Sequence, residues 1–144
     1  MSNLNFKTDS IDAYYDTEEK LLVVAYHGVL SAEITSQFYG WLVSTMKENP
    51  ALVSEARGSI YDFRGVTDFQ SSNITTARKE STTVSQTVDV RDHPVALLVE
   101  TIFQERMVNS TMRLTQQLDR KRIVHSIEDA KAFIDEWHKE NDEE

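Results

Sequence analysis

The chain has 144 residues, of which 40% are apolar, and carries a formal charge of −9 at pH 7. This length and apolar content predict a single domain over residues 1–144, with residues 1–10 and 140–144 frayed. The negative charge disfavours nucleic acid or anionic lipid as a partner, and the zero cysteines exclude disulfides, zinc–thiolate sites and cysteine nucleophiles.

The first predicted element is a β-hairpin in the stretch IDAYYDTEEKLLVVAYHG, which begins at Ile11. Two strand-like runs flank the charged residues 16–20, a short connection of the kind that joins antiparallel neighbours. The second run, residues 21–26, is apolar without alternation. Such a run predicts a strand that is covered on both faces.

A change of period after residue 30 predicts a helix. Apolar or small side chains recur at steps of three and four residues, namely Ile34, Phe38, Trp41, Leu42, Thr45 and Met46. Ser31 is the expected N-cap, and Asn49-Pro50 ends the helix because proline cannot continue its hydrogen bonds. The stretch GSIYDF, residues 58–63, is then a third strand.

Two further strands and three further helices follow. The apolar positions Ile74, Ala77, Val84 and Val88 predict a thin, weakly anchored helix over residues 71–88, because threonine and serine fill the rest. The continuous apolar run within residues 92–100 predicts a central strand. Phe103, Met107, Thr111, Leu114 and Leu118 mark a helix face, residues 122–126 a short strand, and residues 126–140 a last helix capped by Ser126.

The predicted order is therefore β-β-α-β-α-β-α-β-α. Alternating strands and helices are typical of the α/β class, in which helices cover a largely parallel sheet. We expect a single-domain, mixed but mostly parallel sheet of five strands with an N-terminal β-hairpin. No apolar run is long enough to cross a membrane, and the first ten residues lack a secretory signal, so we expect a cytoplasmic protein without stable membrane insertion.

The four histidines do not form a metal-binding pattern. His27, His93, His125 and His138 are far apart in the sequence, and no two have the one-turn spacing that places two ligands on one helix face. We predict no metal and no cofactor.

The polar stretch YDFRGVTDFQSSNI, residues 61–74, is the candidate site. Asp62 and Asp68 could act as an acid–base pair with Arg64 as an electrostatic clamp. The alternative is a turn in which the carboxylates accept backbone N–H bonds and Gly65 adopts a positive φ. No nucleophile elbow, phosphate loop or dinucleotide fingerprint accompanies these residues, so an enzyme is not supported.

Ser71 and Ser72 lie where this stretch meets the predicted helix 71–88. The unpaired N–H groups and the dipole of a helix N-terminus would accommodate a phosphate carried by either serine. The alternative is that one of them only caps the helix.

The element order and this stretch resemble the STAS domain and the SpoIIAA-like proteins, a group also described as STAS/SEC14-like. Those families carry a block Asp-Leu-Ser-Gly-Val-Thr, which residues 62–67 match position by position with Arg64 in place of the small polar residue. A second block, Phe-Ile-Asp-Ser-Ser/Thr-Gly, is occupied by residues 68–73. Here Gln70 stands for the aspartate and Asn73 for the glycine.

The resemblance implies a non-catalytic interaction or regulatory module with a protein partner. Its recognition surface would be the strand-exit loop 62–73, with Ser72, or else Ser71, as the phosphate acceptor. The loop residues that would take part are Asp62, Arg64, Gly65, Asp68, Gln70 and Asn73.

The SEC14-like label implies an alternative, a carrier or sensor of a small apolar or amphipathic ligand held under a mobile helix 71–88. Arg64, Arg78 or Lys79 would then contact the head group of the ligand.

Overall fold

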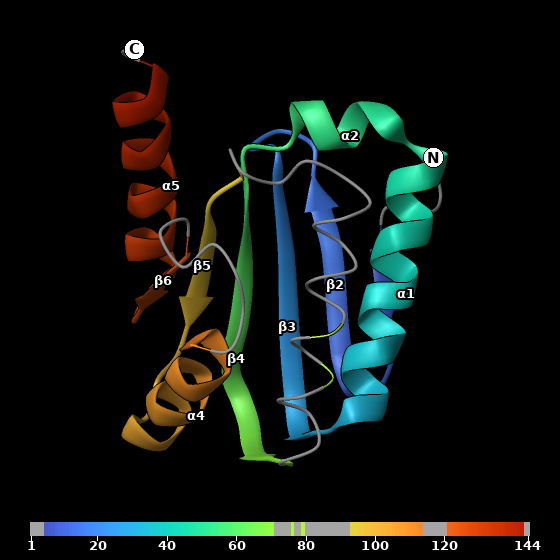
Figure 1. Ribbon diagram of the computed structural model, residues 1–144, viewed down its shortest axis with the longest axis vertical. Helices are drawn as coiled ribbons and strands as arrows, with labels where there is room; N and C mark the ends of the chain where they lie inside the picture. The colour runs from blue at the N-terminus through green and yellow to red at the C-terminus, as the bar shows by residue number, and fades with distance from the viewer. Residues whose placement is uncertain (1–4, 71–75, 77–78, 80–92, 114–120, 143–144) are drawn as a thin grey trace.

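The computed structural model describes residues 5–70, 76, 79, 93–113 and 121–142. One six-stranded sheet runs through the molecule, with its strands in chain order from one edge to the other (Figure 1). The strands are β1 (Asn5–Lys7), β2 (Ile11–Asp16), β3 (Leu21–Leu30), β4 (Gly58–Phe69), β5 (Val95–Leu98) and β6 (Lys121–Val124). The helices are α1 (Ala32–Glu48), α2 (Pro50–Glu55), α4 (Ile102–Arg113) and α5 (Ile127–Asp142).

The pairing of the strands confirms the predicted α/β class. Strands β1, β2 and β3 pair antiparallel, and β3 to β6 pair parallel. The sheet has six strands rather than the predicted five, because residues 5–7, expected to be frayed, form the edge strand β1. Phe6 explains the extra strand, since its ring stacks on Trp41 of α1 with centroids 5.8 Å apart. At the other terminus, α5 continues to Asp142, beyond the predicted end at residue 140.

Proline 50 both ends one helix and begins another. It stops α1 after Glu48, as the sequence predicts, and then occupies the first position of α2, where a missing N–H costs nothing. Apart from this proline, no pattern in the sequence predicts α2. Tyr15 of β2 anchors the short helix by donating a hydrogen bond to the Glu55 carboxylate, at 3.1 Å.

Two of the expected N-caps are confirmed. The hydroxyl of Ser31 accepts the N–H of Ile34 at 3.3 Å, and that of Ser126 accepts the N–H of Asp129 at 3.0 Å. Of the predicted helix 71–88, Thr76 and Lys79 have helical backbone, and the other positions lie outside the described residues.

Helices cover both faces of the sheet. On one face, α1 and α4 pack against an apolar core that includes Phe38, Tyr26 and Val108. On the other face, α5 covers β5, β6 and the nearby part of β4, with Phe133 and Ile134 fully or almost fully buried (Figure 1). Along the described chain, no helix is long and apolar enough to cross a membrane.

Candidate interaction site

The segment predicted to be a strand-exit loop is largely strand. Strand β4 continues from Gly58 to Phe69, so residues 62–69 remain paired with β3 instead of leaving the sheet. The pairing is irregular, because Ala25 lies opposite Asp62 and His27 opposite Gly65, which leaves one more residue on β4 than on β3. A second shift follows between Gly28 and Val29. Each shift is a β-bulge, a feature that bends a strand and re-aims its side chains.

Along the irregular part of the strand, every third residue is buried. Phe63, Val66 and Phe69 point into the core, and Arg64, Gly65, Thr67 and Asp68 are exposed. In the sequence the strand-like run stops at residue 63, which predicts a loop after it. The structure corrects that prediction, because pairing with the ten-residue strand β3 extends the ladder to Phe69.

Gly65 is required by a close approach of β3. A Cβ atom added there would lie 2.7 Å from both the carbonyl oxygen of Tyr26 and the Nδ1 of His27. The expected reason, a positive φ, is wrong for Gly65, whereas Gly28 opposite the same segment does have a φ of 78°. Glycine at residue 65 therefore allows the bulged strands to remain in contact.

Gln104 closes the edge of β4 that β5 leaves open. Strand β5 ends at Leu98, opposite Asp62, so among the described residues no strand pairs with the distal part of β4 on that side. The Gln104 amide nitrogen donates to the carbonyl oxygens of Arg64 and Val66, at 3.1 and 3.0 Å. Its amide oxygen accepts the N–H of Glu100 at 2.8 Å. The side chain is only 3% exposed, and α4 thus takes the place of a strand beside β4 (Figure 1).

The candidate acid–base pair is not assembled. Both oxygens of Asp62 accept hydrogen bonds from the Arg64 guanidinium at 3.0 Å, and these bonds raise the pKa of Arg64. Asp68 is exposed and accepts the N–H of Phe69 at 2.9 Å. Asp62 and Asp68 pair with Ala25 and Val29, four residues apart on β3, which separates the two aspartates by about 13 Å. Acid–base chemistry on one bond would need a much shorter separation.

Three exposed apolar residues lie near the carboxyl ends of the parallel strands. Among the described residues, the exposed large apolar side chains are Tyr14, Val29, Ile102 and Phe103. Val29 is the penultimate residue of β3, and Ile102 and Phe103 begin α4 directly after β5. Phe103 also contacts Phe69, the last residue of β4, with ring centroids 5.9 Å apart. Ile102 and Phe103 therefore lie beside the end of β4, whereas Val29, which directly precedes the buried Leu30 on β3, points to the opposite face of the sheet.

The remaining predicted site residues divide into two groups. Gln70 is exposed and continues from β4 with its N–H donated to the carbonyl of Leu30 at 3.0 Å, and Lys79 is exposed on helical backbone. Ser71, Ser72, Asn73 and Arg78 lie outside the described residues. The described part of the chain contains no cluster of histidines and carboxylates able to hold a metal ion.

Comparison with solved structures identifies the fold. An uncharacterized protein of the DUF3478 family with a SpoIIAA-like fold, from Shewanella loihica PV-4, superposes with a TM-score of 0.54 and 16% identity, covering 93% of this chain and 98% of that one. An anti-sigma factor antagonist from Mycobacterium paratuberculosis gives a TM-score of 0.50 and 11% identity, covering 90% and 97%. The chain has a SpoIIAA-like, or STAS, fold. No family model and no curated protein matches the sequence.

The STAS fold places the distal half of β4 and the start of α4 at one edge of the molecule. The sequence located the β4 part of this site through the resemblance at residues 62–73. It did not identify Gln104 or Ile102. In the sequence, Gln104 is distinguished only as a polar residue that follows Phe103 of the predicted apolar helix face. This pattern is too weak to predict that its side chain is buried.

Proposed function

We propose that this chain is a non-catalytic, regulatory protein-interaction module whose recognition surface is the carboxyl edge of its parallel sheet. The observation that carries the proposal is the exposure of two neighbouring apolar side chains, Ile102 and Phe103, at this edge, with Ile102 71% exposed. Large apolar side chains grouped at one exposed place are typical of binding surfaces, whereas isolated ones are not informative. One structural neighbour is an anti-sigma factor antagonist, a protein named for its action on another protein, which supports the same role.

Charge indicates the kind of partner. Asp68 and Glu100 are exposed beside Ile102 and Phe103. Of the nearby cations, Arg64 is already bound to Asp62, and Arg106 is exposed one turn further along α4. A partner segment that offers an apolar side chain flanked by lysine or arginine would complement this edge. A phosphate on Ser72, two residues after Gln70 in the sequence, would add about 1.5 to 2 negative charges to the chain and strengthen its attraction to a basic partner.

Capture experiments test the surface. A cytoplasmic extract of the source cells would be passed over three immobilised proteins: wild type, Ile102→Asp and Tyr14→Asp. The proteins retained by each would be quantified by mass spectrometry. Both variants replace an exposed apolar side chain with aspartate, but Tyr14 lies on β2, away from the carboxyl edge. We expect a partner retained by wild type and Tyr14→Asp to fall at least tenfold with Ile102→Asp. Equal retention by all three would contradict the proposed surface.

A separate measurement tests the proposal that phosphorylation of Ser72 acts as a switch for partner binding. Intact-mass analysis of protein isolated with phosphatase inhibitors should show one added phosphate, which Ser72→Ala should abolish. Ser72→Asp should change the affinity for the captured partner without moving the urea midpoint of unfolding. A protein that never carries phosphate would remove Ser72 from the proposal while leaving the Ile102 result unaffected.

A further inference from the structure

The outward side of helix α4 carries a cation one turn after Ile102. Residues four positions apart lie on the same side of a helix, and Ile102, Arg106 and Ser110 are all exposed. Gln104 and Val108, which lie between them in the sequence, are buried. At 1.5 Å of rise per residue, Arg106 is about 6 Å further along the helix axis than Ile102. A molecule that contacts Ile102 is therefore within reach of the Arg106 guanidinium.

Arg106 has no internal partner within the described part of the chain. The guanidinium groups of Arg57 and Arg64 each form an ion pair with an aspartate. That of Arg122 lies over the ring of Phe133, 4.6 Å from the ring centroid. The Arg106 guanidinium makes no ion pair, hydrogen bond or ring contact with any residue that the structure describes. In a chain with 24 acidic and 15 basic residues, this exposed cation is available to an external anion.

A guanidinium beside apolar side chains is well suited to binding a carboxylate. Its planar N–H groups match the two oxygens of a carboxylate, and it is more weakly hydrated than the ammonium group of lysine. Contact with Ile102 and Phe103 would exclude water from the neighbourhood of Arg106 and so strengthen an ion pair there. Arginine next to large apolar residues is also a frequent combination at the energetic centres of interfaces.

The charges along this edge follow a fixed order. The exposed anions Asp68 and Glu100 lie at the end of β4 and just before α4. The apolar pair Ile102 and Phe103 follows, and Arg106 lies one turn further along the helix. A purely basic partner segment would meet like charge at Arg106, and a purely acidic one would meet like charge at the two anions. Only a segment that carries both signs in the right order complements the whole edge.

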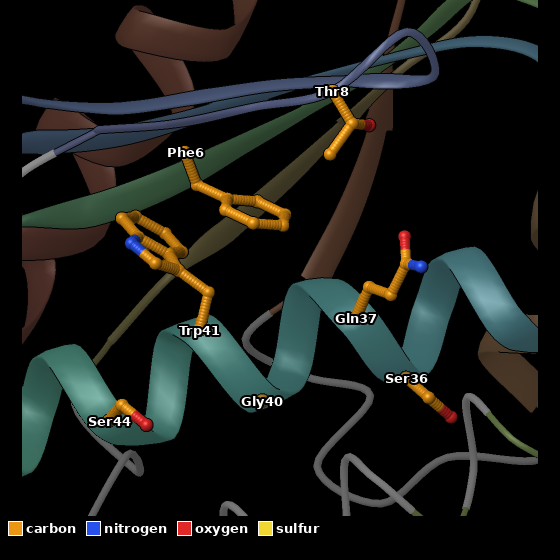
Figure 2. A pocket seen from close by; sticks show the side chains of 7 residues that line it. All are labelled: Phe6, Thr8, Ser36, Gln37, Gly40, Trp41 and Ser44. Carbon is orange, nitrogen blue, oxygen red and sulfur yellow. The ribbon is translucent and has the colours of Figure 1, made fainter.

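Charge sets this edge apart from the shallow groove between strand β1 and helix α1 (Figure 2). The groove is lined by the stacked rings of Phe6 and Trp41, with centroids 5.8 Å apart, and by uncharged residues such as Thr8 and Gln37. Its lining residues carry no charge, so the groove sets no charge requirement for a partner. The edge at α4 sets two such requirements.

From these observations we propose that Arg106 selects the partner of the carboxyl edge by binding a carboxylate of that partner. Arg106 has this role only if the carboxyl edge is the recognition surface, as proposed above. The partner is a protein segment with a bulky apolar side chain that packs on Ile102 and Phe103. An aspartate or glutamate lies on the Arg106 side of that apolar residue, and a lysine or arginine lies on the side of Asp68 and Glu100.

Selection from a library of random displayed peptides tests the chemistry of the partner directly. The immobilised proteins are wild type, Arg106→Glu, Ile102→Asp and the control Lys47→Glu, which reverses an exposed charge in the last turn of α1. Wild type and Lys47→Glu should enrich peptides in which an apolar residue has an acidic residue on one side and a basic residue on the other. Arg106→Glu should enrich peptides with lysine or arginine in place of the acidic residue.

The selected sequences separate failure of the Arg106 assignment from failure of the surface. Peptides that need Ile102 but keep their acidic residue when selected on Arg106→Glu overturn the role of Arg106 and leave the surface intact. Peptides retained equally by Ile102→Asp, or the absence of any apolar consensus on wild type, overturn the surface and with it the role of Arg106.

Affinity measurements by fluorescence anisotropy, with one selected peptide, test the ion pair itself. Arg106→Glu should raise the Kd by about tenfold or more, and Lys47→Glu should leave it unchanged. Replacing the acidic residue of the peptide with lysine should restore binding to Arg106→Glu to within about threefold of the original pair. Circular dichroism melting should be the same for wild type and Arg106→Glu, because Arg106 is exposed. A Kd that does not respond to Arg106→Glu, or a swapped peptide that restores nothing, overturns the proposal.

Discussion

Replacing Gln104 with alanine is expected to destabilise the fold by about 3 kcal/mol. The side chain is 3% exposed, and its amide donates to two carbonyl oxygens of β4 while accepting the N–H groups of Glu100 and Thr101, at 2.8 and 3.3 Å. The Val66 carbonyl is buried, and leaving such a group unpaired costs about 1–3 kcal/mol. The other three groups are partly buried, so water can replace part of each bond, at about 0.5 kcal/mol each.

Urea unfolding followed by circular dichroism measures this cost. With a slope of about 2 kcal/mol per molar, a loss of 3 kcal/mol lowers the urea midpoint by roughly 1.5 M. Gln70→Ala is the matched control, since Gln70 is exposed and its backbone hydrogen bond to Leu30 survives the substitution. The control should change stability by less than about 0.5 kcal/mol.

Gln104→Glu gives a second, pH-dependent readout. The glutamate keeps an oxygen for the N–H groups of Glu100 and Thr101 but presents oxygen instead of N–H to the β4 carbonyls. Only a protonated glutamate can donate to one of these carbonyls, so burial should raise its pKa above the unfolded value. Its stability relative to wild type should be highest below pH 4 and fall as pH rises through the folded pKa. A loss under 1 kcal/mol in Gln104→Ala, together with a pH-independent Gln104→Glu, would refute this role.

Two further substitutions test other contacts of the sheet. Gly65→Ala places a Cβ atom 2.7 Å from the Tyr26 carbonyl oxygen, which cannot move freely. The substitution should therefore lower the free energy of unfolding, measured in urea, by about 2–3 kcal/mol. In the control Gly40→Ala the added Cβ atom meets no described atom within 4 Å, so this variant should not lower the free energy of unfolding. Burial and the Glu55 hydrogen bond raise the pKa of Tyr15 from 10.0 to about 12. The free energy of unfolding of wild type, relative to that of Tyr15→Phe, should therefore fall by up to about 2.7 kcal/mol as the pH rises from 10 to 12. Below pH 10 it should not fall, and a difference that does not depend on pH would contradict the contact.

The sequence by itself determined the elements whose signals are local. Helix α1 and its Ser31 cap follow from a 3.6-residue period and a hydroxyl at the right place, and the same holds for α5 after Ser126. The largely parallel α/β class follows from the alternation of elements. Each of these signals is contained within a few turns of chain, so no distant contact is needed to interpret it.

Only the tertiary structure decided the form of the candidate site. The bulges of β4 exist because β3 is long enough to pair with it, and Gln104 is needed because β5 stops early, both of which depend on residues about 40 positions apart. Pairing between distant segments overrides local pattern where the two conflict.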